Sequence, residues 1–397
     1  MHGETAHTTA DATDGFWQLT ASDIQGIERA LTTLRKEYNS AAVALEGRAG
    51  TRKTVANLVV YAASERDAEI ANGTLAALAG RHPARTMLIV GGTGRCAEGI
   101  DATISAACSL DAGRRICYEE IRLHAPGAGG PQLRSIVAPL LISELPTFLW
   151  WTGDPPFRDD TFLALAELSD RVLVDSARFQ YLEQTLSRLG RFIESDAQAT
   201  AIGDLNWGRV APLRELIAQL FDPPQALALL PHIRRVRIEH ATGNDTPGTA
   251  QALLLAGWLA SRLDWEPSQM GERTFAGAAR ARLRGFGHDV VIELRAARHP
   301  RAVPGDVQSV QIEADDGQRA ALFSVVRAED QKHARVRTAF DGSEASERIA
   351  RCITPDDAAL LGAELDELQP DAVYMEAAAM AGRLAVVLPR PEPLPSP

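Results

Sequence analysis

The sequence predicts an α/β protein: two α/β layered regions followed by an antiparallel β-meander with C-terminal helices (α+β). Three observations support this class. Strand-like and helix-like segments alternate between residues 54 and 263, which is typical of a largely parallel sheet. Short segments of period two, separated by glycine-containing turns, then run from residue 281 to residue 338 and indicate antiparallel pairing. Two helical segments end the pattern.

The first region begins with a helix near Ser22, because Ser22 and Gln25 form a capping-box pattern. Residues 100–108 alternate between apolar and polar side chains, as a half-buried strand does, and residues 115–123 are their expected hairpin partner. Hydrophobic runs and helical periodicity predict the other elements: strands at 54–61, 86–90, 147–151 and 171–175, and helices at 64–78, 133–142, 160–168 and 178–189.

The second region contains a helix, a strand and a helix, at 210–220, 234–240 and 249–263. The meander after it has turns that supply residues able to adopt positive φ, such as Asp315-Asp316-Gly317. Its strands and the closing helices are expected at 281–285, 290–298, 307–314, 320–327 and 334–338, and at 355–368 and 371–384.

These elements divide into two predicted domains. The N-terminal α/β domain covers residues 16–190, and the C-terminal domain, which holds α/β elements plus the β-meander, covers residues 191–388. A polar stretch at 1–15 is expected to be a disordered tail. The Pro-rich stretch at 389–397 is expected to be a second tail, because proline can neither continue a helix nor pair inside a sheet.

Composition argues against several classes of protein. The 397 residues carry 41 basic and 52 acidic side chains, a net charge of −11, whereas a compact nucleic-acid binder usually carries a basic face. No run of about 18 apolar residues is present, so we expect no membrane span. The chain starts without signal-peptide features, and its four cysteines (Cys96, Cys108, Cys117 and Cys352) form no Cys-x-x-Cys pair. We therefore expect a cytoplasmic protein without a zinc site.

Two glycine motifs suggest nucleotide chemistry without meeting its requirements. Gly92 to Ala97 fits the G-x-G-x-x-A dinucleotide pattern, but the next segment has period two where a helix must begin. Gly47 to Thr54 resembles a P-loop, but Arg52 occupies its second glycine position. The chain also lacks Gly-x-Ser-x-Gly and His-Glu-x-x-His motifs, so the sequence predicts no catalytic residue, cofactor or metal ligand.

A candidate partner interface follows the strand at 147–151. Adjacent residues of a strand point to opposite faces, so one of Trp150 and Trp151 can sit in the core while the other lies near the surface or under a helix. Asp154, Pro155 and Pro156 form a stiff loop beside them, and bulky aromatic residues next to a rigid loop suit a protein interface. The alternative is that both tryptophans pack inside the domain.

Three arginines are candidate anion contacts, because guanidinium groups bind carboxylates and phosphates bidentately. They are Arg134, Arg209 and Arg214. The alternative for each of them is an ordinary ion pair at the protein surface. Arginine is abundant throughout this chain, with lysine only at Lys36, Lys53 and Lys332, so an arginine alone does not indicate a site.

Segments spread between residues 85 and 384 carry a family resemblance. They include the runs Arg115 to Ile121, Pro139 to Pro146, Trp150 to Pro156, Asp170 to Ser176, Asp204 to Trp207, and Asp371 to Tyr374. In these runs the chain resembles the OpcA family, the glucose-6-phosphate dehydrogenase assembly proteins. Residues before Thr54 add little to the resemblance.

The resemblance implies a non-catalytic protein that binds glucose-6-phosphate dehydrogenase. Such a protein is an assembly factor or allosteric activator that favours the active oligomer of the dehydrogenase, at the entry of the oxidative pentose phosphate pathway. The alternative left open by the residues is an α/β enzyme or sensor, which would bind a nucleotide at the Gly92 loop or a sugar phosphate at the three arginines.

Overall fold

The computed structural model describes residues 16–46, 54–79, 81–92, 101–111, 114–195, 200–243, 249–274, 278–343 and 346–389. The chain divides into two compact units, and each unit takes three stretches of it. The first unit consists of Met1–Arg178, Ala199–Gly203 and Asp356–Pro370, and the second of Phe179–Gln198, Asp204–Pro355 and Asp371–Pro397. The predicted boundary between residues 190 and 191 stays a prediction. The predicted tail at 1–15 and residues 390–397 of the second tail lie outside the described residues.

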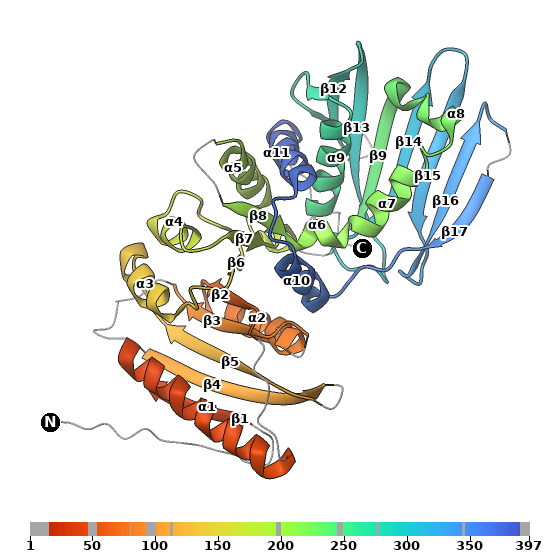
Figure 1. The fold of residues 1–397 in the computed structure, drawn as a ribbon. Helices are drawn as coiled ribbons and strands as arrows, with labels where there is room; N and C mark the ends of the chain where they lie inside the picture. Colours follow the sequence, from red (N-terminus) through yellow and green to blue (C-terminus); the bar gives the residue numbers. More distant parts are fainter. Residues whose placement is uncertain are drawn as a thin grey trace. The chain divides into compact units, whose positions relative to one another are not determined.

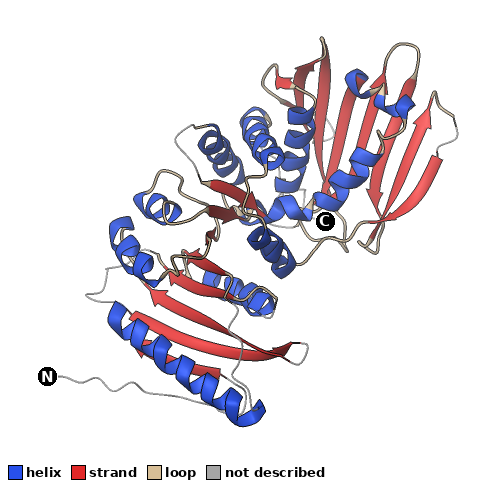
Figure 2. Cartoon of the chain, viewed as in Figure 1, coloured by secondary structure: helices blue, strands red, loops and turns tan. Residues whose placement is uncertain are grey.

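The first unit is built on an eight-stranded sheet (Figures 1 and 2). Its strands, in spatial order, are β1 (Phe16–Ala21), β4 (Asp101–Asp111), β5 (Arg114–His124), β3 (Ala84–Val90), β2 (Ala56–Ala62), β6 (Thr147–Trp151), β7 (Arg171–Val174) and β8 (Ala201–Asp204). Strands β5, β3, β2, β6 and β7 run parallel, and β4 forms the predicted antiparallel hairpin with β5. The α/β class predicted from the sequence is therefore confirmed.

The central parallel strands of this sheet, β3, β2, β6 and β7, are buried on both faces. Every residue of β6 and β7 is buried, and β2 and β3 each have one residue that is half-buried. Continuous hydrophobic runs such as Leu58-Val59-Val60 and Leu88-Ile89-Val90 are typical of strands that are covered on both sides. The core of the first unit lies along these runs.

The helices of the first unit begin at polar side-chain caps, except for one that begins at Gly129. They are α1 (Ile24–Glu46), α2 (Glu65–Ala79), α3 (Gly130–Val137), α4 (Asp160–Ala166) and α10 (Asp357–Asp366). Asp23, one residue after the predicted cap Ser22, accepts a hydrogen bond from the Gly26 amide at the start of α1. Helix α3 ends at Val137, earlier than predicted, and Pro139 follows in a short 3₁₀ turn.

The second unit is built on a nine-stranded sheet. The strands on its main path are β10 (Glu266–Pro267), β12 (Ala279–Gly285), β13 (His288–Ala297), β9 (Ile233–Ala241), β14 (Val307–Asp315), β15 (Ala320–Arg327), β16 (His333–Phe340) and β17 (Ser346–Arg351), and β11 (Glu272–Arg273) pairs with β12. Strand β9 runs parallel to β13 and antiparallel to β14. The predicted second α/β region and the meander thus share one mixed sheet.

The helices of the second unit are α5 (Leu182–Glu194), α6 (Leu205–Arg209), α7 (Ala211–Gln219), α8 (Pro224–Leu227), α9 (Ala250–Arg262) and α11 (Ala372–Val387). Helix α11 packs against both α5 and α9 (Figure 1). Small residues permit this close approach: a Cβ on Gly257 of α9 would overlap the Ala377 carbonyl, and a Cβ on Gly382 of α11 would lie 2.6 Å from the Leu186 carbonyl of α5.

Candidate functional site

The carboxyl edge of the first sheet is the place where an α/β fold of this kind binds ligands. Six of its strands, β2, β3, β5, β6, β7 and β8, can be numbered 1 to 6 in chain order. Across the sheet they then lie in the order 3-2-1-4-5-6. Doubly wound dinucleotide-binding domains have this order, and their ligand lies at the switch point between the first and fourth strands. In this chain the switch point lies between β2 and β6.

Aromatic side chains fill the carboxyl edge at the switch point. Tyr61 on β2 and Trp151 on β6 are register partners, and their rings stack with centroids 4.0 Å apart. Phe162 of α4 packs edge-on against Trp151 at 5.3 Å. The backbone amide and hydroxyl of Thr152 both donate to the Tyr61 carbonyl at 3.0 Å, which fixes the ends of the two strands together. Burial raises the pKa of Tyr61, so its hydroxyl stays neutral.

The turn from β2 into α2 carries acidic side chains where a dinucleotide fold has glycines. It reads Ala62-Ala63-Ser64, and the first turn of α2 contains Glu65 and Asp67. Ser64 donates its hydroxyl to Asp67 Oδ2 at 2.7 Å and accepts the Asp67 amide at 3.2 Å. Carboxylates already occupy the positive end of this helix, so a phosphate there would meet like charge.

The two predicted glycine motifs lie largely outside the described residues. Gly92 follows β3, the second strand of the order, and has a φ of +116°. A Cβ on the preceding residue, Gly91, would overlap the Tyr61 hydroxyl, so Gly91 makes room for the Tyr61 side chain. Residues 93–97 of the first motif and residues 47–53 of the second are not among those that the structure describes.

The predicted interface run ends β6. Both tryptophans are buried, with Trp150 3% and Trp151 4% exposed, which agrees with the alternative that both pack inside the domain. The reason is that β6 lies inside a parallel sheet and has no solvent face. Pro155 is also buried, whereas Asp154 and Pro156 are half-buried after Gly153, which turns the chain at a φ of +75°. Contact of this run with a partner stays a prediction.

A second aromatic cluster lies in the second unit and joins two of the segments that carry the family resemblance. Trp207 of α6 donates Nε1–H to Asp371 Oδ2 at 2.8 Å, and Asp371 Oδ1 also caps α11 by accepting the Tyr374 amide at 2.9 Å. Tyr374 is fully buried, with its ring 5.8 Å from that of Trp207. This cluster anchors the first turn of α11 to α6.

Arg214 of α7 completes this cluster. Its guanidinium lies 3.3 Å from the centre of the Trp207 ring, a cation–π contact, and its Nη2 donates to the Trp207 carbonyl at 3.4 Å. Burial lowers the pKa of Arg214 to about 10, although Asp371 opposes the shift. Its Nε has no hydrogen-bond partner among the described residues. The geometry is that of a packed arginine, and binding of an anion there stays a prediction.

The other two predicted anion contacts have partners of their own. Arg134 of α3, in the first unit, forms an ion pair with Glu167. Arg209 ends α6 in the second unit, where its charge acts on Asp306. Burial raises the pKa of Asp306, and its carboxylate accepts Gln251 Nε2 at 2.9 Å. Anion binding by these two arginines also stays a prediction.

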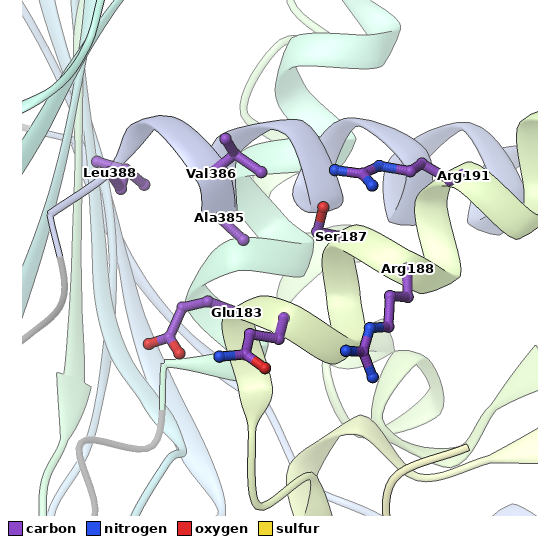
Figure 3. A pocket seen from close by; sticks show the side chains of 8 residues that line it. Glu183, Ser187, Arg188, Arg191, Ala385, Val386 and Leu388 are labelled. Carbon is purple, nitrogen blue, oxygen red and sulfur yellow. The ribbon is translucent and has the colours of Figure 1, made fainter. Parts of the chain in front are cut away.

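An open groove of about 380 Å³ runs between α5 and the end of α11 (Figure 3). Arg188 and Arg191 lie one turn apart on α5, and neither has an ion-pair partner among the described residues. Ser187 and Glu183 of the same helix also line the groove, and Val386 of α11 is 53% exposed beside them. Sequence reasoning missed this groove, because it depends on helices that are far apart in the chain.

Metal binding and membrane insertion find no support in the described part of the chain. There, no three histidine, cysteine, aspartate or glutamate side chains lie close enough to hold a metal ion. No described helix combines the length and hydropathy needed to cross a bilayer. Cys352 is buried as a free thiol whose pKa burial raises, so its thiolate is disfavoured.

Comparison with known proteins gives two adjoining family matches. Residues 75–191 match the glucose-6-phosphate dehydrogenase subunit N-terminal domain, and residues 200–378 match the C-terminal domain of the same subunit. The chain is 36% identical over 243 residues to an OxPP cycle protein OpcA of Nostoc punctiforme, covering 60% of this chain and 48% of that one. It is 34% identical over 173 residues to an OxPP cycle protein OpcA of Synechocystis, covering 43% and 35%. The chain thus spans less than half the length of these relatives.

Solved structures with a similar arrangement are distant. An oxidoreductase from Sinorhizobium meliloti has a TM-score of 0.45 at 10% identity, covering 83% of this chain and 89% of that one. KijD10, a 3-ketoreductase from Actinomadura kijaniata, has a TM-score of 0.44 at 9% identity, covering 84% and 96%. Similarity this low bears on neither activity nor cofactor.

Proposed function

This chain belongs to the OpcA family, the glucose-6-phosphate dehydrogenase assembly proteins, and from that membership we propose its function. It binds glucose-6-phosphate dehydrogenase as a non-catalytic assembly factor and allosteric activator, and it favours the active oligomer of that enzyme. By doing so it supports the oxidative pentose phosphate pathway, in the cytoplasm.

The observation that carries the non-catalytic part of the proposal is the aromatic stack at the switch point. Tyr61, Trp151 and Phe162 fill the crevice in which this strand order otherwise holds a dinucleotide. The acidic first turn of α2 adds like charge where a phosphate would bind. A domain whose ligand crevice is packed with its own side chains suits a role in protein–protein contact better than one in hydride transfer.

Activation requires that the chain bind one conformation of the dehydrogenase more tightly than another. An effector shifts a conformational equilibrium only by its differential affinity for the two states. Typical coupling free energies are about 1–3 kcal/mol, a change of about 5–150-fold in apparent affinity. We therefore expect the chain to lower the apparent KM of the dehydrogenase for glucose 6-phosphate by a factor in this range.

The test uses the purified chain and the dehydrogenase from the same cell. The two proteins are expected to elute together from a sizing column, and the apparent KM is expected to fall as the chain is titrated in. Separate elution together with unchanged kinetics, under both reducing and oxidising conditions, would contradict the proposal. Turnover of glucose 6-phosphate by the chain alone would contradict its non-catalytic part.

The loop after β6 remains our candidate contact in this complex. Asp154 and Pro156 are its solvent-accessible residues, and the buried Trp150, Trp151 and Pro155 hold it in place. Asp154→Lys reverses the charge of a half-buried side chain in this loop. It is expected to weaken binding of the dehydrogenase, and circular dichroism checks that the variant is still folded.

A second function, sensing of an anionic metabolite, is favoured by one observation: the α5–α11 groove holds two arginines without ion-pair partners in the described structure (Figure 3). Two guanidinium groups one turn apart can share a phosphate. Glucose 6-phosphate at about 100 times Kd would stabilise the protein by about 2.7 kcal/mol. A thermal shift that the Arg188→Ala, Arg191→Ala double variant loses would support this function, and no shift at millimolar ligand would argue against it.

A further inference from the structure

The nine-stranded sheet has one buried face and one accessible face. On β9 the buried Val236 and Ile238 alternate with Arg235 and Arg237, whose side chains are 36% and 41% exposed. The strand register places these exposed positions beside outward residues of β13 and β14, so one continuous face extends from β12 to β17. We call the outward side chains in the middle of these strands the arginine face.

One end of the arginine face is an ion-pair ladder across β12, β13, β9 and β14. Glu293 accepts Arg280 at 2.8 Å and Arg237 at 3.3 Å, and Glu313 accepts Arg237 at 2.6 Å and Arg235 at 3.2 Å. Glu272 of β11 also contacts Arg280, at 3.2 Å. Each of the two central carboxylates is therefore shared by more than one guanidinium group.

The other end shows the same sharing. Glu347 of β17 accepts Arg335 at 3.0 Å and Arg337 at 3.2 Å, both from β16. Near the first ladder, Arg295 of β13 lies 3.8 Å from Glu239, which also contacts His299. Arg282 of β12 is exposed and has no ion-pair partner among the described residues.

Positive charge is therefore in excess on this face. The pairs described above involve six arginines and five glutamates, and Arg282 adds a seventh arginine, although the whole chain has a net charge of −11. Between the two charged ends, β14 and β15 present uncharged side chains, including the half-buried Gln311 and Val326. The face also exposes apolar side chains such as Leu322 (44%) and Ile349 (71%). Protein interfaces commonly have such an uncharged or apolar centre with charged residues around it.

We propose that the arginine face is the docking surface for an acidic face of glucose-6-phosphate dehydrogenase. The inference rests on the proposed function, because that function supplies the partner. A second copy of this chain suits the face less well: a two-fold axis through the uncharged centre would place one cationic end against the other. An acidic partner would instead supply further carboxylates to arginines that now share a single carboxylate with a neighbouring arginine.

The test measures binding of the dehydrogenase by full-length variants. The double variant Arg282→Glu, Arg335→Glu reverses one charge at each end, and Arg337 remains to pair with Glu347. The matched control is Arg301→Glu, which reverses an exposed arginine of the same unit that stands in the loop between β13 and β14, outside the strands of the sheet. We expect the double variant to bind about tenfold or more weakly at low salt, the control to bind like the wild type, and affinity of the wild type to fall as salt rises.

The outcomes separate this inference from the function on which it rests. If the wild type binds and the double variant, still folded by circular dichroism, binds equally well, the docking surface is wrong and the proposed function stands. If the wild type does not bind the dehydrogenase, both fail. If the wild type is a dimer by light scattering and the double variant is a monomer, the face holds a second copy and the inference is overturned.

Discussion

The two sheets of this molecule place charge in opposite ways. In the first sheet the central strands β2, β3, β6 and β7 are buried on both faces, and a charged group such as Arg171 is enclosed with its partners. In the second sheet only one face is buried, and the other carries ion pairs that water reaches. The difference shows why these central strands of the first sheet offer little accessible surface to a partner protein, whereas the second sheet offers a broad one.

The largest effect is expected from opening the aromatic stack of the first sheet. Trp151→Ala removes the ring that stacks on Tyr61 and leaves a cavity between β6 and α4. Loss of a buried tryptophan should lower the free energy of unfolding by about 3–5 kcal/mol, measured by urea denaturation. Trp151→Phe is the control and should cost much less. Equal stabilities of the two variants would mean that the switch point is not tightly packed.

The next effect compares a buried ion pair with an exposed one. Arg171 is 2% exposed and pairs with Glu364 of α10 at 2.6 Å, while its Nη1 donates to the Gln369 carbonyl at 2.6 Å. Glu364→Gln leaves the buried guanidinium without its counter-charge and should cost about 3 kcal/mol.

The matched substitution lies on the second sheet. Glu347→Gln removes a carboxylate that is 41% exposed and should change stability by about 1 kcal/mol or less. Denaturation of the two variants under the same conditions checks the comparison. A similar cost for both would show that the sheets do not differ in how they hold charge.

A third effect concerns the buried face of the second sheet, and it depends on pH. His240 of β9 is 1% exposed, and burial lowers its pKa to about 4, from about 6.5 in the unfolded chain. Its Nδ1 has no hydrogen-bond partner in the described structure, while Glu239 and His299 are the charged groups that act on it.

Above pH 6.5 the histidine is neutral in both states and does not affect stability. As pH falls toward 4, the unfolded chain takes up a proton that the folded chain cannot, so stability is lost. Between pH 7 and pH 5.5 this loss should be about 1–2 kcal/mol. His240→Gln should flatten that dependence in thermal melts.

Local patterns predicted the elements but not their partners. Strand β6 has the predicted bounds because five bulky apolar or β-branched residues stand between turn signals, and β15 agrees as well. Strands β1, β8 and β17 were missed, because each is short and takes its place through pairing rather than through its own periodicity. No sequence pattern shows that β9 joins β13 and β14 in one sheet.

The candidate sites show the same limit. Alternation along β6 placed the two tryptophans on opposite faces and left open whether one of them reaches the surface. Alternation implies exposure only where a sheet has a solvent face, and β6 lies inside a parallel sheet. Tyr61 could have been singled out as a bulky residue ending the first strand of an α/β unit. Its stacking partner, 90 residues later, could not have been identified from the sequence alone.

The smallest effect tests the aromatic cluster of the second unit against that of the first. Arg214 lies over Trp207, so Arg214→Met removes the charge and keeps much of the packing. The cation–π contact should contribute about 1 kcal/mol, less than the apolar stack around Trp151. Urea denaturation measures this cost, and the fluorescence of Trp207 should change because its ring loses a neighbouring charge. Arg188→Met is the control: it changes an exposed arginine without a ring contact and should leave both signals unchanged. If Arg214→Met cost more stability than Trp151→Ala, the ranking of the two clusters would be reversed.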